Sequence, residues 1–362
     1  MFIFNKGCKN IGGVKQKMKK KYYLEAMRIL AVLLVMYNHS APFMSFATQS
    51  GLEKNVSFLL SLICKAAVPL FFMISGVLLL GKEESFRDLF QKRILRMIYV
   101  IIIFSLLYHF KMAWKGATPF APLHVFLRLP FDLVFLPYWY LYSYIGFLAI
   151  LPFVRAIAKH MTKNMLYYLI LLQILTESLA VTCTAFGYPQ LCGYFSAGGM
   201  IHMFLFYPLV GYGLDKYIEE EHFGGKWNLL RNLSFFAVAL VTWKMVYLDA
   251  MQNDGIYREM RIGTWIQWIS IILFINVKIL FSEKRLTEPM KKMLSLFGGC
   301  VFGIYLLDGF IGTGGTMDVI YLKLMPYISY LPAFLVEILV VFFMRFVLAY
   351  TMKKLPVFRK LL

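Results

Sequence analysis

The sequence predicts an all-α fold, a polytopic membrane protein built as a bundle of about ten transmembrane helices. Hydrophobic residues make up 60% of the chain and charged residues only 16%, and the mean hydropathy is +0.66. The apolar residues also gather in runs of about 20, the length of helix that crosses the hydrocarbon core of a bilayer. These observations together predict a multi-pass protein of the cell membrane.

The first five apolar runs each have the length of one crossing. Arg93 and Arg96 stand at the inner end of the third run, and Trp139 opens the fourth. We expect these helices near residues 22–44, 57–80, 94–112, 133–154 and 164–184.

The last five runs are less uniform. Trp243 and Lys244 interrupt the seventh span of the series, and glycines at 298–299 and 312–315 flank the ninth. We expect these helices near residues 193–214, 230–248, 262–282, 295–314 and 325–350.

The net charge of +19 follows the pattern of a membrane topology. With the N-terminus in the cytoplasm, most of the 38 Lys and Arg residues fall on the inner side, as the positive-inside rule requires. An even number of spans then places the C-terminus in the cytoplasm as well. The basic segment 15–21 is a topology signal that can also touch anionic membrane lipid. Nucleic-acid binding is not implied.

The chain is predicted to form one membrane domain without a soluble module. Residues 1–21 are a basic cytoplasmic arm, 22–354 a single transmembrane domain and 355–362 a cytoplasmic tail. The first apolar run is too long for a signal peptide and lacks a small-residue cleavage pattern, so we expect it to stay as a helix. The sequence leaves the oligomeric state open.

Cysteine and histidine spacing predicts no metal site. Cys183 and Cys192 fall in one short outer loop, where oxidising conditions can join them, and the sequence leaves open whether they are bonded. No group of Cys and His residues has the spacing of metal ligands.

The first span carries the strongest candidate for a functional site. Arg28 and His39 are eleven residues apart, so on a helix they lie on nearly the same face, roughly 16 Å apart along the axis. Charged side chains are costly in hydrocarbon and normally face a bundle interior or a wet cavity. We therefore expect the chemistry of the protein near this face.

Several local motifs follow one another along the first part of the chain. They are the pair Arg28 and His39, the segment with Phe71, Phe72, Ser75 and Gly76, the pair Arg93 and Arg96, and Trp139-Tyr140-Leu141. This set resembles the acyltransferase-3 family of integral-membrane enzymes, which has an Arg and a His at this spacing, a Phe-Phe-x-x-Ser-Gly signature and an Arg-x-x-Arg motif. The resemblance covers most of the chain. Members of the family transfer acyl groups, commonly acetyl, from cytoplasmic acyl-CoA to sugars and other acceptors.

The chain departs from the family pattern at two places. The Trp139-Tyr140-Leu141 form resembles the branch without a Trp-Ser-Leu-x-x-Glu motif, so no role of that Glu carries over. Gly303-Ile304-Tyr305-Leu306-Leu307-Asp308 resembles a Gly-Ile-Tyr-Leu-x-His stretch, but Asp308 stands where many members have a second His. Either Asp308 partners His39 or Arg28, or the position serves packing and topology.

Residue chemistry assigns the catalytic role to His39. Acyl transfer to a hydroxyl needs a base whose pKa lies near neutrality, and His is the side chain best matched to that task. His39 lies near the outer end of its helix, so an acceptor presented from outside can reach it. An alternative role is that of acyl carrier, in which the imidazole takes the acyl group from the thioester and hands it on. The sequence does not separate the two roles.

Arginines on the inner side are the candidates for binding coenzyme A. A guanidinium binds phosphate with a planar fork of donors that Lys cannot reproduce, and Arg93 and Arg96 stand on the cytoplasmic side. Arg28 is expected to hold part of the donor or to stabilise negative charge, with Glu25 one turn away as its orienting partner. Other expected cavity residues are Trp139, Tyr140, Tyr305 and Asp308.

Each assignment has a structural alternative. His39 can serve packing, Arg28 can reach the inner headgroups, and Trp139 and Tyr140 can belong to the interfacial aromatic belt. Arg93 and Arg96 can anchor the topology. Three further polar residues lie within predicted spans, but no motif gives them a role: Glu177, His202 and Glu337.

The expected function is that of a membrane O-acyltransferase. The donor is cytoplasmic acyl-CoA, with acetyl as the acyl group and no tightly bound cofactor. The acceptor is a hydroxyl of a surface polysaccharide, a lipid-linked sugar or an exported metabolite. Two other classes fit a polytopic protein with buried charges, a transporter or flippase and an inactive sensor domain. The lack of paired broken helices speaks against the first, and His39 against the second.

Overall fold

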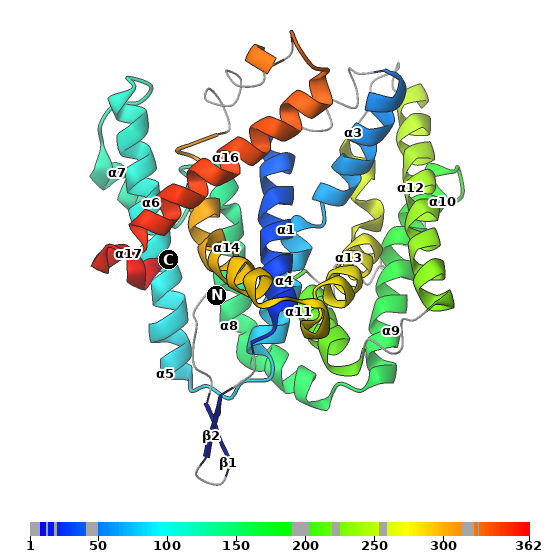
Figure 1. Ribbon diagram of the computed structural model, residues 1–362, viewed down its shortest axis with the longest axis horizontal. Coiled ribbons are helices and arrows are strands. Elements are labelled where there is room, and N and C mark those ends of the chain that lie inside the picture. The colour runs from blue at the N-terminus through cyan, green and yellow to red at the C-terminus, as the bar shows by residue number, and fades with distance from the viewer. Residues whose placement is uncertain are drawn as a thin grey trace.

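Helices dominate the computed structural model of the protein (Figure 1). The structure describes residues 8–11, 14–17, 20–40, 50–189, 203–218, 225–252, 259–312, 322–324 and 326–362. Within these ranges, the strands are β1 (Cys8–Ile11) and β2 (Val14–Lys17), and the helical elements are α1 (Tyr22–His39), α3 (Gly51–Cys64), α4 (Ala67–Leu79), α5 (Phe86–Leu89), η1 (Phe90–Ile94), α6 (Leu95–Trp114), α7 (Pro122–Arg128), η2 (Leu136–Tyr138), α8 (Trp139–His160), α9 (Lys163–Gln173), η3 (Ile174–Leu179), α10 (Ala180–Ala185), α11 (Met203–Tyr217), α12 (Lys226–Gln252), η7 (Glu259–Trp265), α13 (Ile266–Leu280), η8 (Glu283–Arg285), α14 (Glu288–Leu306), α16 (Tyr330–Met352) and α17 (Pro356–Leu361).

Seven helical segments of the described chain are long and apolar enough to cross a membrane. The other three predicted spans also contain helices, namely α1, α11 and α14, but these fall short in length or hydropathy. In α1 the shortfall has a clear source, because Glu25, Arg28 and His39 interrupt an otherwise apolar helix. The protein is therefore a multi-pass membrane protein, and the full count of ten stays a prediction.

The predicted span 57–80 is not one continuous helix. α3 ends at Cys64 and α4 begins at Ala67, so Lys65 lies in a break between two helical pieces. Two other spans contain π-helical turns, η1 before α6 and η3 between α9 and α10. Such turns are frequent at functional sites, because the wider turn re-aims the side chains that follow it.

α1 forms the centre of the bundle (Figure 1). It packs against α3, α4, α13, α14 and α16. Met27, Ala31 and Val32 on this helix have no exposed surface. A helix that is buried on nearly all sides does not contact lipid, so α1 can carry polar residues where a peripheral span cannot.

α4 and α11 make the closest helix contact in the core. A Cβ atom on Gly76 would overlap the carbonyl oxygen of Pro208, and one on Gly211 would overlap the carbonyl oxygen of Met73. Small residues let two helix backbones approach in this way inside a membrane. Ser75, next to Gly76, donates a hydrogen bond to the carbonyl oxygen of Phe71 at 2.6 Å. The Phe-Phe-x-x-Ser-Gly segment therefore forms a helix crossing.

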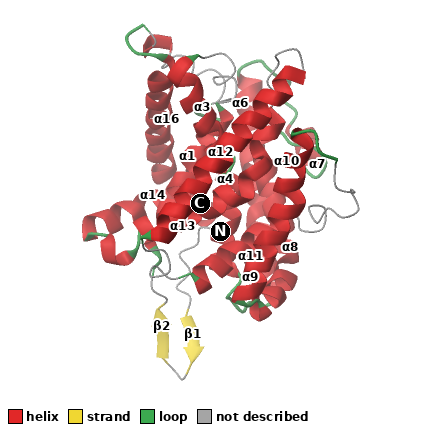
Figure 2. Cartoon of the chain, turned by 90° about the vertical axis from the view of Figure 1, so that its right-hand side faces the viewer, coloured by secondary structure: helices red, strands yellow, loops and turns green. Residues whose placement is uncertain are grey.

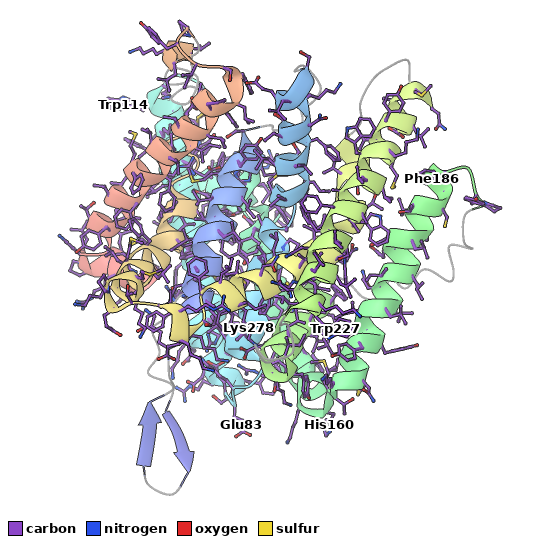
Figure 3. All side chains as sticks on the ribbon, turned by 45° about the vertical axis from the view of Figure 1, so that its right-hand side comes forward. Glu83, Trp114, His160, Phe186, Trp227 and Lys278 are labelled. Atoms are coloured by element: carbon purple, nitrogen blue, oxygen red, sulfur yellow. The ribbon has the colours of Figure 1, made fainter. Side chains whose placement is uncertain are left out.

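The loops gather at two opposite ends of the bundle. Glu83 and His160 lie at one end, and Trp114 and Phe186 at the other (Figure 3). The antiparallel hairpin of β1 and β2 projects from the first end (Figure 2). This is the alternation expected for inner and outer loops. The assignment of the first end to the cytoplasm stays a prediction.

The last residues of the chain form a packed helix. α17 contacts α6, and Leu361 and Leu362 are buried. The segment that the sequence suggests as a tail thus belongs to the helical bundle in this structure.

Candidate active site

A cavity of about 490 Å³ lies beside the C-terminal end of α1. Its walls come from α1, from the break between α3 and α4, from the start of α8, and from the segments around η3, α11 and α13. The lining residues are Val35, Asn38, His39, Cys64, Lys65, Ala67, Val68, Pro69, Trp139, Gln173, Glu177, Met203, Phe206, Tyr207, Gly263, Ile266 and Gln267. The cavity is mostly apolar with a few polar groups, as is typical of a small-molecule site.

His39 is the catalytic candidate in this cavity, and two buried charges stand behind it. Its Nδ1 atom lies 2.8 Å from Oδ2 of Asp308. The other oxygen of Asp308 lies 2.6 Å from Nη1 of Arg345. The side chain of His39 is 17% exposed, whereas those of Asp308 and Arg345 are each 1% exposed. The three groups therefore form a chain from the cavity into the interior.

Three helices that are distant in sequence create this arrangement. His39 ends α1, Asp308 follows the end of α14, and Arg345 lies on α16. Arg345 is fixed further by a hydrogen bond from its Nε to the carbonyl oxygen of Ile311 at 2.5 Å. Of the alternatives that the sequence left open for Asp308, the structure has the contact with His39.

The contact with Asp308 also fixes the tautomer of the His39 imidazole. An ionised carboxylate only accepts hydrogen bonds, so Nδ1 of His39 must carry the proton. The lone pair of the neutral ring then lies on Nε2, the atom that a general base or a nucleophile needs. The carboxylate of Asp308 also stabilises the imidazolium that forms when Nε2 takes a proton. The ion pair with Arg345 balances the charge of Asp308 in the interior.

Polar residues on the other walls of the cavity were missed by sequence reasoning. Lys65 lies in the helix break and donates a hydrogen bond to Asn38 at 2.8 Å. Gln173 and Glu177 come from the α9 and η3 segment, and Gln267 comes from α13. Their only signal in the sequence is polarity inside an apolar run, which for Glu177 was noted but not assigned a role.

The predicted aromatic residues take different positions. Trp139 lines the cavity. Tyr140 and Tyr305 are buried and pack edge to face with each other at 5.9 Å, and the Tyr305 hydroxyl donates a hydrogen bond to the carbonyl oxygen of Pro137. Neither is among the lining residues given above, so their contact is with the protein core.

Arg28 lies at the opposite end of α1 from His39. It is 7% exposed, and its Nη1 atom lies 2.8 Å from Oε2 of Glu25. Lys20 approaches the other oxygen of Glu25 at 3.6 Å. The expected pairing of Glu25 with Arg28 is thus present, but Arg28 does not line the cavity that contains His39.

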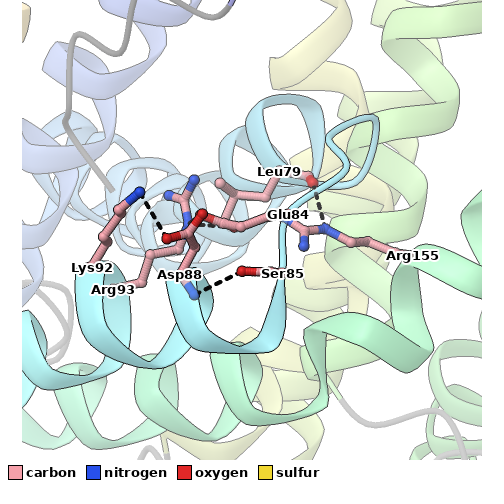
Figure 4. A network of polar contacts seen from close by, with 7 residues as sticks. All are labelled: Leu79, Glu84, Ser85, Asp88, Lys92, Arg93 and Arg155. Atoms are coloured by element: carbon pink, nitrogen blue, oxygen red, sulfur yellow. Dashed lines mark hydrogen bonds and ion pairs between the residues drawn. The ribbon is translucent and has the colours of Figure 1, made fainter.

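Arg93 is held by an acidic residue from the neighbouring loop (Figure 4). Its Nε atom donates to both oxygens of Glu84 at 2.9 and 2.8 Å. Arg155 of α8 donates to the same carboxylate at 3.0 Å and to the carbonyl oxygen of Leu79 at 3.0 Å. Burial would raise the pKa of Glu84, but the hydrogen bonds from the two arginines outweigh it and hold this pKa below its usual range.

Arg96 has a different environment from Arg93. Its Nη2 atom donates to the carbonyl oxygen of Leu361 at 2.8 Å, and no carboxylate lies within ion-pair distance of it among the described residues. Arg28, Arg93 and Arg96 all interact electrostatically with the buried Tyr144 of α8. The three predicted arginines therefore lie within electrostatic reach of one buried side chain.

The pair Cys183 and Cys192, whose bonding the sequence leaves open, falls partly outside the described residues. Cys183 is a free thiol in the described part of the chain, and Cys192 lies outside it. His202, another polar residue of a predicted span, also lies outside it.

Comparison with known proteins gives one match. A family model described as an acyltransferase domain, that of the acyltransferase-3 family, covers residues 21–354. No curated protein and no solved structure matches the chain. The match extends over nearly the whole chain. It includes every lining residue of the cavity and also Arg28, Arg93 and Arg96. The protein therefore belongs to the acyltransferase-3 family.

Proposed function

We propose that the protein is an O-acyltransferase that moves an acetyl group from cytoplasmic acetyl-CoA to a hydroxyl. The observation that carries this proposal is the position of His39, which lines a cavity while Asp308 holds its Nδ1 atom at 2.8 Å. The arrangement is that of the His and Asp of a hydrolytic triad, in which the hydroxyl of the acceptor takes the place of the serine.

In the direct mechanism His39 acts as general base. Nε2 takes the proton of the acceptor hydroxyl, and the oxygen of that hydroxyl attacks the carbonyl carbon of the thioester. The carbon–sulfur bond then breaks, and the imidazolium returns the proton to the leaving thiolate, which departs as coenzyme A. Asp308 stabilises the positive charge that His39 carries between these two steps.

The same geometry supports the alternative in which His39 carries the acyl group. Nε2 then attacks the carbonyl carbon of the thioester, the carbon–sulfur bond breaks, and coenzyme A leaves as the thiolate. The acceptor hydroxyl next attacks the acyl-imidazolium and the carbon–nitrogen bond breaks. The hydroxyl proton is released and balances the charge of the thiolate. Because Nδ1 is bound to Asp308, both mechanisms use the same nitrogen. They differ in whether a covalent intermediate forms before the acceptor arrives.

The inner arginine cluster is the proposed site for the phosphates of coenzyme A. Arg28, Arg93 and Arg96 each interact electrostatically with Tyr144, and Lys82 adds a further positive charge near Arg93. Glu84 and Glu25 neutralise only part of this charge. Guanidinium groups bind phosphate through charge-assisted hydrogen bonds. The acceptor would enter from the opposite end, where His39 lies.

The experiment that tests this function measures transfer of label from acetyl-CoA. Membranes with wild-type protein are compared with membranes that contain the His39→Ala variant at matched expression, and label is counted in the surface-glycan and lipid fractions. The matched control is His124→Ala, because His124 is exposed and lies outside the cavity. Incorporation that is lost only with His39→Ala supports the proposal. Equal incorporation by wild type and His39→Ala would refute it.

Rapid quenching of the labelled reaction in denaturant at neutral pH separates the two mechanisms, because an acyl-imidazole hydrolyses quickly in acid. The carrier mechanism predicts label on the protein when acceptor is withheld, and loss of that label in His39→Ala. The general-base mechanism predicts no labelled protein under the same conditions.

A further inference from the structure

The wall of the cavity formed by α9 and η3 presents the side-chain amide of Gln173. Gln173 is 5% exposed and lines the cavity. Its Oε1 atom is buried and has no hydrogen-bond partner in the described part of the chain. An unpaired buried amide oxygen costs on the order of 1–3 kcal/mol. A hydroxyl group of a ligand can supply a donor to this oxygen.

Glu177, one turn further along, presents a second acceptor to the cavity. Gln267 of α13 donates from Nε2 to Oε2 of Glu177 at 3.3 Å, and Ser178 donates to Oε1 of Gln267 at 3.1 Å. The chain of contacts from Ser178 through Gln267 orients the Glu177 carboxylate. Supporting contacts of this kind hold a binding group in a fixed position before the ligand arrives.

The backbone at this wall is irregular. Glu177 lies within the π-helical turn η3, which begins directly after Gln173. A π turn contains one more residue than an α turn, so it changes the angle between side chains that would otherwise stack along one face. This is a second, independent feature that marks the segment as a binding wall.

The charge balance of the cavity indicates the kind of ligand. Among the described lining residues, Lys65 supplies an amino group and Glu177 a carboxyl group. Trp139 adds a flat apolar surface to the same cavity. Acceptor oxygens on Gln173 and Glu177 pair with hydroxyl protons, and a carboxylate in the wall disfavours an anionic ligand.

We propose that Gln173, Glu177 and Gln267 form the acceptor subsite and that this subsite takes a neutral sugar or polyol. Gln173 and Glu177 accept hydrogen bonds from hydroxyls that do not react, while Gln267 orients Glu177. These contacts select the acceptor and hold its reacting hydroxyl at His39. The inference rests on the proposed function for its role in catalysis, but the binding that it requires can be measured without turnover.

The test is direct binding of a glycan to the purified protein in lipid nanodiscs. The probe is the surface polysaccharide of the cells that naturally contain this protein, after alkaline treatment has removed its acyl groups. The polysaccharide is titrated into the nanodiscs, and binding is measured by calorimetry. One lost hydrogen bond of about 1.4 kcal/mol corresponds to tenfold in affinity, so we expect Gln173→Leu and Glu177→Gln each to weaken binding about tenfold.

Matched controls exclude general damage to the protein. Gln252→Leu and Glu83→Gln change the same residue types at exposed positions that are not among the lining residues of the cavity, and both should bind with wild-type affinity. Elution as a single species in size-exclusion chromatography shows that a variant is folded. If Gln173→Leu does not fold, the affinity of Glu177→Gln alone tests the subsite, because this substitution keeps the volume of the side chain.

Different results overturn the inference and the proposed function. Wild-type affinity in folded Gln173→Leu and Glu177→Gln, or no binding of the glycan to the wild type, overturns the subsite. Tighter binding of a glycan whose sugars have been oxidised to carboxylates overturns the assignment to a neutral acceptor. Normal binding without any transfer of acetyl label leaves the subsite in place and refutes the transferase function instead.

Discussion

His39 and Asp308 are 269 positions apart in the chain and 2.8 Å apart in the structure. The contact joins the end of α1 to the turn after α14, and it is extended by the ion pair between Asp308 and Arg345. A buried carboxylate beside an imidazole sets the tautomer of the ring and stabilises its protonated form. The relationship gives Asp308 a positioning role that a second histidine would not fill in the same way.

We expect Asp308→Asn to reduce kcat by on the order of 10³-fold, within the range that general acid–base catalysis contributes. An amide can donate to Nδ1 and so favours the tautomer that leaves the proton on Nε2, where it blocks the reaction. The KM for acetyl-CoA should change little. The matched control is Asp132→Asn, since Asp132 is half exposed and pairs with Arg128 on the surface. An unchanged kcat would remove Asp308 from the mechanism.

Arg345→Met should destabilise the protein strongly. Removal of one partner of a buried ion pair typically costs about 3–5 kcal/mol, because the other charge stays buried without compensation. Asp308 would then be that charge. We expect a large drop in the midpoint of thermal unfolding in detergent.

The double variant separates stability from catalysis at this pair. Asp308→Asn together with Arg345→Met removes both charges, so much of the lost stability should return, whereas activity should stay low. A double variant as unstable as Arg345→Met alone would show that the ion pair is not the source of the effect.

Much of the fold was predictable from the sequence, because hydropathy reports each span locally. Every predicted span contains a helix, and the pairing of Glu25 with Arg28 follows from their separation of one turn. The break at Lys65 was not predictable, because the apolar run continues through it. The contacts of Asp308 with His39 and Arg345 depend on how three spans pack, which hydropathy does not encode.

The candidate site was predictable only in part for the same reason. His39 and the inner arginines stand in motifs, so sequence reasoning found them. Gln173 and Gln267 are single polar residues in apolar runs and belong to no motif. They line the same cavity as His39 in the structure, and hydropathy does not report that proximity.

Gly76→Ala should disturb the crossing of α4 and α11. A Cβ at this position overlaps the backbone of Pro208, and a backbone cannot move aside as a flexible side chain can. Overpacking of a core typically lowers the free energy of unfolding by about 1–3 kcal/mol. Because the contact at Gly76 is with backbone, we expect a loss of stability at the upper end of that range. The control is Gly299→Ala, where a Cβ would meet only the end of the Lys353 side chain at 4.0 Å. Thermal unfolding of both variants in detergent checks the prediction, and equal midpoints would contradict it.

Glu84→Gln should lower stability at neutral pH by about 2 kcal/mol, because the carboxylate accepts charge-assisted hydrogen bonds from Arg93 and Arg155. The pKa of Glu84 is lower in the folded protein than its ordinary value of 4.5. Its contribution is therefore fully present above the ordinary pKa and is lost as the pH falls through the lower folded pKa. The difference in stability between wild type and variant should shrink over that acidic range. The exposed neighbour Glu83 provides the control Glu83→Gln, which should follow the wild type at every pH.

Arg96→Gln should raise the KM for acetyl-CoA by about tenfold or more and leave kcat within a few-fold of the wild type. Among the described residues Arg96 is bound to a carbonyl oxygen, that of Leu361, and not to a carboxylate. Its charge is thus more available to a phosphate than that of Arg93, which faces Glu84. A charge-assisted hydrogen bond contributes about 1.5–3 kcal/mol, or about 10- to 100-fold in affinity. Saturation kinetics with acetyl-CoA measure the effect, and Arg87→Gln on the exposed surface of α5 is the control. An unchanged KM in Arg96→Gln would mean that the donor phosphates bind elsewhere, whereas a rise that disappears with a donor lacking the 3′-phosphate would identify the phosphate that Arg96 holds.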